Sequence, residues 1–101
     1  MTFAEKTRPA ENRSMSLPDA FAAIADPNRR HLLEELRRGP RTVNELAAGL
    51  TVSRPAVSQH LKVLLDTGLV SARAAGTSRI YAIQPGGFMR LNLWLDQFWE
   101  E

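Results

Sequence analysis

The chain has 101 residues, enough for one domain, and 44% of them are hydrophobic, which suffices for a compact core. It has no cysteine, which excludes disulfides, thiolate metal sites and thiol redox chemistry from these residues. The net charge is only +2, and no run is apolar enough for a transmembrane helix or the core of a secretion signal, so we expect a cytoplasmic protein.

The N-terminal part of the chain divides at Leu17. Residues 1–16 mix acids, bases and a proline without apolar periodicity, so we expect a disordered arm there, either an inert tail or the product of a start upstream of Met15. From Leu17 the pattern becomes helical, and Leu17, Phe21 and Ile24 share one face. We therefore predict a first helix from Leu17, and a single folded domain over residues 17–101.

A second helix is predicted in the stretch ADPNRRHLLEELRRGP. Asp26 is suited to cap its first turn and Pro27 to open it, while Gly39 and Pro40 end it. Its buried stripe is expected to consist of Leu32, Leu33 and Leu36.

Two further helices are predicted close together. In RTVNELAAGL, Thr42 and Glu45 have the spacing of a capping box, in which each side chain satisfies a backbone amide of the other residue. Only Thr51 and Val52 separate this short helix from Ser53, the expected cap of the next one. Two helices joined by so tight a turn form a helix-turn-helix, although such corners also occur in structural roles.

The second of these helices, within SRPAVSQHLKVLLDTGLV, has one apolar and one polar face, and Gly68 is expected to end it. The apolar stripe consists of Val57, Leu61, Leu64 and Leu65. The polar face presents Arg54, Ser58, Gln59 and Lys62. Such side chains on a helix in a major groove can contact base edges or phosphates. An amphipathic helix whose polar face is merely solvated is the alternative.

After this helix the period changes from helical to alternating. The runs Val70–Ala74 and Arg79–Ile83, on either side of residues 75–78, predict a β-hairpin. Its tip is small and polar and is flanked by Arg73 and Arg79, which suits a wing lying along a phosphate backbone or entering a minor groove. A hairpin that only covers the core is the alternative.

The charge distribution agrees with this interpretation. Between Val52 and Arg79 there are four bases and a single acid, Asp66, and such a local surplus is typical of nucleic-acid binding. We therefore expect double-stranded DNA as a partner. The residues predicted to contact it are Thr42, Ser53, Arg54, Ser58, Gln59, Lys62, Arg73, Thr77, Ser78 and Arg79.

A last helix is predicted to begin near Phe88, after Pro85-Gly86-Gly87 ends the hairpin. Its apolar residues recur at helical spacing, and both tryptophans of the chain lie in or beside it. Packing of this helix on its own domain accounts for part of the apolar surface. So much aromatic area on a peripheral helix also suggests an interface between two copies of the chain, formed together with the first helix. The predicted dimer residues are Phe21, Ile24, Leu91, Trp94, Leu95 and Phe98.

Several of these segments resemble the winged helix-turn-helix regulators of the arsenical-resistance (ArsR) family, and the resemblance covers residues 17–83. They are ADPNRRHLLEEL, TVNELAAGL, SRPAVSQHLKVLLDTGLV and RIYAI. The resemblance implies a mainly helical fold with four helices, a β-hairpin wing and a fifth, C-terminal helix. It also implies a homodimer paired through its first and last helices, which binds an imperfect inverted repeat and usually represses transcription until a signal releases it.

The chain departs from the metal sensors of that family. Those proteins place cysteines on the helix spelled here ELAAGL, or aspartate and histidine on the last helix, which here contains no histidine. His31 and His60 are the only histidines and do not make a ligand set, since zinc requires at least three protein ligands. We therefore expect no metal cofactor, and the residues identify no effector.

Two other classes of function remain as alternatives. An enzyme is not expected, because the chain lacks a cysteine, a histidine cluster and a glycine-rich phosphate loop. A winged helix used for protein contacts is the more serious alternative. DNA binding weakens steeply with ionic strength because counterions are released, so a salt titration separates the two.

Overall fold

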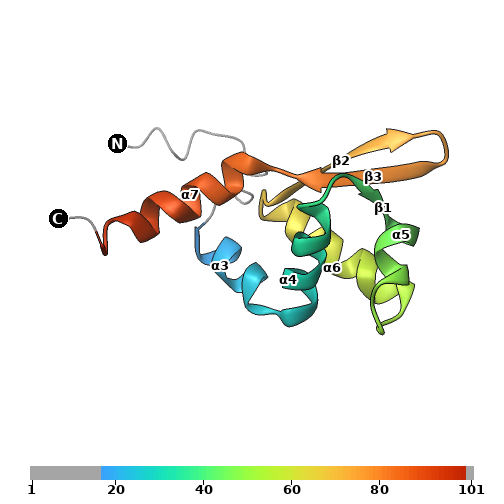
Figure 1. Ribbon diagram of the computed structural model, residues 1–101, viewed down its shortest axis with the longest axis horizontal. Coiled ribbons are helices and arrows are strands. Elements are labelled where there is room, and N and C mark those ends of the chain that lie inside the picture. Colours follow the sequence, from blue (N-terminus) through green and yellow to red (C-terminus); the bar gives the residue numbers. More distant parts are fainter. Residues whose placement is uncertain (1–16, 100–101) are drawn as a thin grey trace.

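The computed structural model describes residues 17–99, so the arm predicted for residues 1–16 lies outside the described residues. Within residues 17–99 the chain forms five helices and a three-stranded antiparallel sheet, the order expected of a winged helix-turn-helix (Figure 1). The elements are α3 (Leu17–Ala25), α4 (Pro27–Leu36), β1 (Arg41–Thr42), α5 (Val43–Ala48), α6 (Arg54–Asp66), β2 (Val70–Ala75), β3 (Ser78–Ile83) and α7 (Pro85–Asp96).

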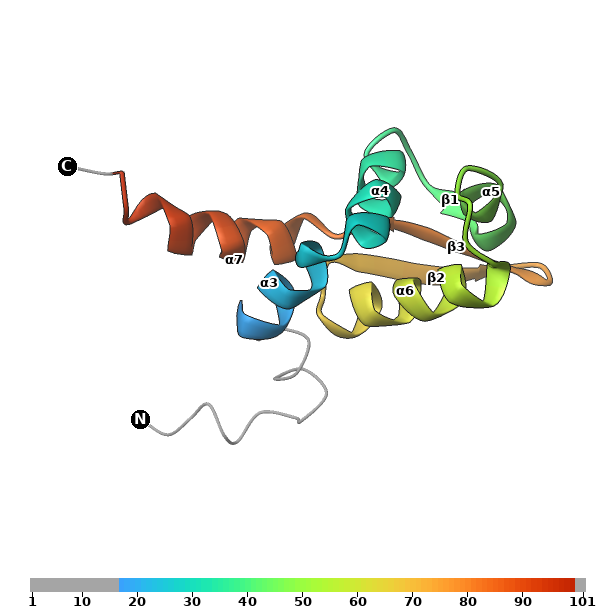
Figure 2. The same ribbon diagram turned by 90° about the horizontal axis from the view of Figure 1, so that it is seen from below.

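The core lies where α3, α4, α5 and α6 meet the inner face of the sheet, and α6 runs along that face (Figure 2). The predicted stripes of α4 and α6 are confirmed, except that Leu65 is only partly buried. The largest fully buried side chains are Leu32, Leu46, Val57, Leu61, Leu64 and Leu69. Burial of this apolar surface fixes α6 at the centre of the domain.

The predicted helix caps are confirmed. The Asp26 carboxylate accepts the backbone N–H of Arg29 at 3.0 Å, and the Ser53 hydroxyl accepts that of Ala56 at 3.3 Å. In α5, Thr42 N–H donates to the Glu45 carboxylate at 2.8 Å, and Glu45 N–H donates to the Thr42 hydroxyl at 3.2 Å. These bonds satisfy amides that a helix leaves unpaired at its start, so each helix begins at a defined residue.

The wing is longer and its turn tighter than the sequence predicted. Strands β2 and β3 continue to the pair Ala75–Ser78, which leaves Gly76 and Thr77 as a two-residue turn. Gly76 has a φ of 63° and Thr77 does not have a positive φ, the pattern of a type II′ turn. The wing therefore ends in a narrow tip.

Strand β1 was not predicted, because two residues give no periodic signal. It pairs with the outer edge of β3, with Arg41 opposite Tyr81 and Thr42 opposite Ile80. This pairing ties the start of α5 directly to the wing. The two parts of the molecule that flank the polar face of α6 are thereby held at a fixed separation.

Helix α7 begins at Pro85, one turn earlier than the predicted start near Phe88. Pro85 suits the first turn because proline lacks the N–H that is unpaired there anyway. Gly87 is buried where α7 crosses the turn after α6, and a Cβ at this position would collide with the carbonyl oxygen of Gly68. Gly68 itself ends the α6 region with a φ of 81°, as predicted.

Beyond this crossing, α7 extends away from the wing beside α3 (Figures 1 and 2). The first and last described helices thus lie together at the end of the molecule opposite the wing tip (Figure 1). None of the helices within residues 17–99 has the length and apolar character needed to cross a bilayer.

Candidate nucleic-acid interface

A polar groove of about 740 Å³ lies between α5, α6 and the wing. Eight of the predicted DNA-contact residues line it: Thr42, Arg54, Ser58, Gln59, Lys62, Thr77, Ser78 and Arg79. They come from three stretches of sequence that the HTH turn and the β1–β3 pairing bring together. Ser53 and Arg73 do not line this groove.

The floor of the groove is the polar face of α6. Ser58, Gln59 and Lys62 are exposed there, and the Nζ atom of Lys62 lies 3.2 Å from the carboxylate of Asp66 one turn later. An exposed ion pair of this kind contributes little to stability, so Lys62 can exchange Asp66 for a phosphate at small cost. Ser58 and Gln59 present both donors and acceptors to anything that enters the groove.

Asn44 of α5 is a residue that the sequence analysis missed. Its side-chain oxygen accepts a hydrogen bond from Nε of Arg54, so α5 holds the first residue of α6 from the side. The bond engages Nε and leaves the two terminal amino groups of Arg54 for another partner. Those amino groups are the pair that binds a phosphate or a guanine edge in bidentate fashion.

The hairpin register separates the two arginines of the wing. Arg79 and Tyr81 are two residues apart on β3 and share its inner face, and the Arg79 guanidinium lies 5.7 Å from the centre of the Tyr81 ring. Tyr81 is buried and lines the groove beside Arg79. Arg73 pairs with Ile80 and therefore occupies the outer face of the hairpin. Both arginines were predicted to lie in the wing, but their placement on opposite faces was not predicted.

Ser53 is placed just outside the groove. Its hydroxyl is occupied as the cap of α6, where it accepts the N–H of Ala56. The structure therefore shows a structural role for this side chain, alongside its predicted contact with DNA.

An aromatic cluster joins the first and last described helices. The ring of Trp94 makes edge contacts with Phe21 of α3 at 5.3 Å and with Phe98 at 4.7 Å between ring centres. Trp94 and Phe98 remain 41% and 64% exposed, whereas Leu91 is only 5% exposed and belongs to the domain's own core. Of the predicted dimer residues, Leu91 is thus already covered within one chain.

Within the described residues no three histidine, cysteine, aspartate or glutamate side chains come close enough to hold a metal ion. His31 lies near a single carboxylate, with Nε2 at 3.9 Å from Glu35. His60 lies near Asp26, with Nδ1 at 4.0 Å from its carboxylate.

Comparison with known proteins identifies the family. The model of the bacterial regulatory proteins of the arsR family matches residues 26–72, from the cap of α4 into β2. The HTH-type transcriptional regulator Rv2034 of Mycobacterium tuberculosis is 54% identical over 83 residues, which cover 81% of this chain and 78% of that protein. The chain belongs to the ArsR family.

Other ArsR-type proteins support this assignment. A probable mercury resistance operon repressor of Streptomyces lividans is 44% identical over 63 residues, covering 62% of this chain and 50% of that protein. A crystal structure of a possible transcriptional regulator for arsenical resistance superposes with a TM-score of 0.75 at 43% identity, covering 82% of this chain and 86% of that one.

A solution structure from Mycobacterium bovis, a homodimeric winged helix-turn-helix DNA-binding domain, superposes with a TM-score of 0.66 at 27% identity, covering 83% of this chain and 82% of that one. This ArsR-family chain is accordingly a DNA-binding transcriptional regulator with the winged helix-turn-helix fold that its sequence predicted.

Proposed function

We propose that this ArsR-family regulator is a cytoplasmic homodimer that binds an imperfect inverted repeat in double-stranded DNA and represses transcription there, without enzymatic activity. The observation that carries the proposal is the groove, whose lining combines the exposed Ser58 and Gln59 of α6 with Arg54 at the start of α6 and Arg79 of the wing. This is the arrangement of a base-reading helix flanked by phosphate-binding side chains.

In this proposal α6 enters the major groove of DNA. A glutamine side chain can bond to adenine in bidentate fashion, so Gln59 is the candidate for base recognition, with Ser58 beside it. Arg54 and Lys62 lie near bases or phosphates at either side. Thr42 and Ser53, at the starts of α5 and α6, are candidates for contacts to the sugar-phosphate backbone.

The wing has a separate role in the proposal. Because Arg79 and Arg73 lie on opposite faces of a narrow hairpin, a wing tip inserted in a minor groove would present one arginine to each strand. Thr77 and Ser78 at the tip supply short donors that fit between them. The wing would then contribute affinity for any sequence, while α6 supplies the discrimination.

The dimer is proposed to form through α3 and α7. The cluster of Phe21, Trp94 and Phe98 leaves much of its aromatic surface exposed, and pairing across a two-fold axis would cover it together with Ile24 and Leu95. The domain from Mycobacterium bovis has the same fold and is homodimeric, which supports the proposal of a dimer. Two recognition helices related by such an axis lie about 34 Å apart, one turn of DNA, which calls for an inverted repeat.

The test is a selection from random-sequence duplex DNA with the purified protein. We expect an inverted repeat to be enriched, and its affinity to fall steeply with salt as phosphate contacts release counterions. Affinity should be unchanged by a metal chelator. No enrichment of any sequence would reject the proposal and favour a winged helix used for protein contacts, and loss of binding on chelation would reject its metal-free form.

A further inference from the structure

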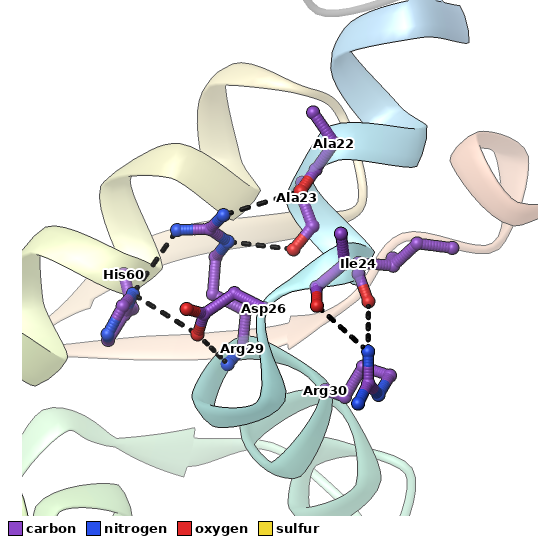
Figure 3. Close-up of polar contacts among 8 residues, drawn as sticks. Ala22, Ala23, Ile24, Asp26, Arg29, Arg30 and His60 are labelled. Atoms are coloured by element: carbon purple, nitrogen blue, oxygen red, sulfur yellow. Dashed lines mark hydrogen bonds and ion pairs between the residues drawn. The ribbon is translucent and has the colours of Figure 1, made fainter.

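Three helices of the domain are joined by one side chain, that of Arg29, at the start of α4 (Figure 3). Its Nε donates to the carbonyl of Ala23 at 2.7 Å, and its Nη2 donates to that of Ala22 at 3.4 Å. Both carbonyls belong to the last turns of α3. Its Nη1 lies 3.3 Å from Nδ1 of His60, which is on α6. Arg29 therefore connects α3 of the proposed dimer seam to the proposed recognition helix.

The neighbouring residue provides an internal comparison. Arg30 also holds the end of α3, through hydrogen bonds of 3.0 Å from Nη1 to the carbonyls of Ile24 and Ala25. Within residues 17–99 it makes no hydrogen bond to α6 (Figure 3). The two arginines thus share the attachment to α3, and Arg29 adds the attachment to α6.

The chemistry of the Arg29–His60 contact depends on one proton. A guanidinium only donates, so Nδ1 of His60 must offer its lone pair and carry no hydrogen. The carboxylate of Asp26 lies 4.0 Å from the same Nδ1 and accepts the backbone N–H of Arg29. A proton on Nδ1 would abolish the bond from Arg29, set two cations against each other and favour Asp26 as the partner.

In the described part of the chain, few other polar or charged groups lie close enough to His60 to compete with Arg29 and Asp26 for its ring. Its side chain is 20% exposed. Among the described residues, the charged groups that face it are Asp26 and Arg29 of the α3–α4 corner, while α3 contributes the carbonyl groups bonded to Arg29. Helix α5 and strand β2 also pack near α6, but within residues 17–99 neither contributes a hydrogen bond or ion pair to the His60 side chain.

We propose that Arg29 is a positioning residue that holds α6 at a fixed orientation to α3, and that it does so only while Nδ1 of His60 is unprotonated. This inference rests on the proposed function, because α3 then lies in the dimer seam and α6 in the DNA. The link sets how the two recognition helices of a dimer are oriented to one another. It matters most for a site that engages both helices at once.

The link between Arg29 and His60 determines whether DNA binding strengthens or weakens as the pH falls. Imidazole is the side chain whose charge changes near neutral pH. Added positive charge on a protein ordinarily strengthens DNA binding. Here acidification should instead weaken binding to the inverted repeat, because it breaks the contact that orients α6.

The first experiment compares Arg29→Gln with Arg30→Gln, using the duplex selected by the wild-type protein and a duplex that carries one half-site. Arg29→Gln should bind the inverted repeat about tenfold more weakly, the loss expected for a hydrogen bond to a charged group, with a much smaller loss on the half-site. Arg30→Gln should change both affinities by the same small factor. Equal losses for the two variants, or an equal loss on both duplexes for Arg29→Gln, would overturn the proposal.

The second experiment measures affinity for the inverted repeat between about pH 8 and pH 6, the range in which imidazole titrates. Wild-type affinity should fall on acidification. His60→Asn offers an amide oxygen to Arg29 without titrating, so it should bind like the wild type at the higher pH and stay constant. Constant or rising wild-type affinity, or the same fall in His60→Asn, would overturn the proposal even where Arg29→Gln fails to fold.

These outcomes are distinguishable from failure of the proposed function. A wild-type protein that selects no inverted repeat, or that is monomeric, rejects the proposed function. A dimeric wild type that selects the repeat, and whose affinity responds to neither Arg29→Gln nor pH, rejects the positioning role alone.

Discussion

Single carboxylates define where two of the helices begin. The backbone N–H of Arg29 holds the pKa of the Asp26 carboxyl below its usual value, and the backbone N–H of Thr42 does the same for the pKa of Glu45. Both groups accept these bonds as anions, so protonation weakens the start of α4 and of α5. The identity of both caps was predictable from sequence, since capping residues stand at fixed spacings.

This gives a prediction for acid stability. A carboxyl whose pKa is lower in the folded state than in the unfolded state stabilises the fold above its unfolded pKa, and that stabilisation is lost as the pH falls through the folded pKa. The melting temperature should therefore fall as the pH drops below about 5. Glu45→Gln should reduce this dependence of the melting temperature on pH. Glu34 is exposed and caps no helix, so Glu34→Gln should leave the dependence unchanged. Thermal unfolding followed by circular dichroism checks this, and an unchanged pH dependence in Glu45→Gln would contradict it.

A second prediction at the residue scale separates base recognition from backbone binding. Gln59→Ala should cost about 1–3 kcal/mol on the selected duplex and relax discrimination against altered bases, with the salt dependence retained. Arg79→Ala should weaken all sequences alike and reduce the salt slope by about 1. Affinities on selected and mismatched duplexes at several salt concentrations measure both effects. A Gln59→Ala variant with unchanged discrimination would remove that face of α6 from the DNA.

Helices and hairpin were predictable from sequence where a period or a cap marks them. The pairing of strands was not predictable from sequence. Strand β1 has only two residues and is a strand because it pairs with Tyr81 and Ile80 of β3. The opposite placement of Arg73 and Arg79 likewise follows from the register of a two-residue turn, which composition alone does not fix. The start of α7 at Pro85 was not predicted, because the proline and two glycines of its first turn are residues typical of loops.

The crossing of α7 over the end of α6 yields a prediction at the scale of elements. Gly87→Ala should destabilise the domain by about 1–3 kcal/mol, because its Cβ would press against the backbone of Gly68 rather than against a movable side chain. Gly86→Ala is the matched control, since a Cβ there meets nothing within 4 Å. It should be neutral or stabilise by about 0.5 kcal/mol, because alanine favours a helix over glycine. Chemical denaturation measures the free energy of unfolding of both variants. Equal values would show that α7 does not pack against the backbone of Gly68 at Gly87.

At the scale of the molecule, the candidate site combines side chains from residues 42–44, 54–66 and 77–81, and each stretch is recognisable in the sequence as part of a cap, a helix or a wing. Their convergence on one groove was predictable from the helix-turn-helix and wing pattern. The contacts that fix its geometry were not, because they join residues distant in sequence: Asn44 with Arg54, and Arg29 with His60. A single sequence contains no signal that pairs such residues.

The last prediction concerns assembly. Trp94 lies on the side of α7 that contacts Phe21 of α3, whereas Met89 lies on the side that faces α4. Trp94→Glu would place a charge in the proposed seam, where it would lose its hydration on pairing, so the variant should be monomeric. Met89 is 61% exposed, and Met89→Glu should leave the dimer intact.

Monomers should bind the inverted repeat weakly, because losing the partner removes half of the base contacts and half of the phosphate contacts at once. Their core should remain folded, since Trp94 is 41% exposed in a single chain and is not among the fully buried side chains. Analytical ultracentrifugation at micromolar concentration, beside operator titrations of the wild type and both variants, measures these effects. A monomeric wild type, or a monomeric Trp94→Glu variant with undiminished affinity for the inverted repeat, would show that α3 and α7 do not pair the subunits for DNA binding.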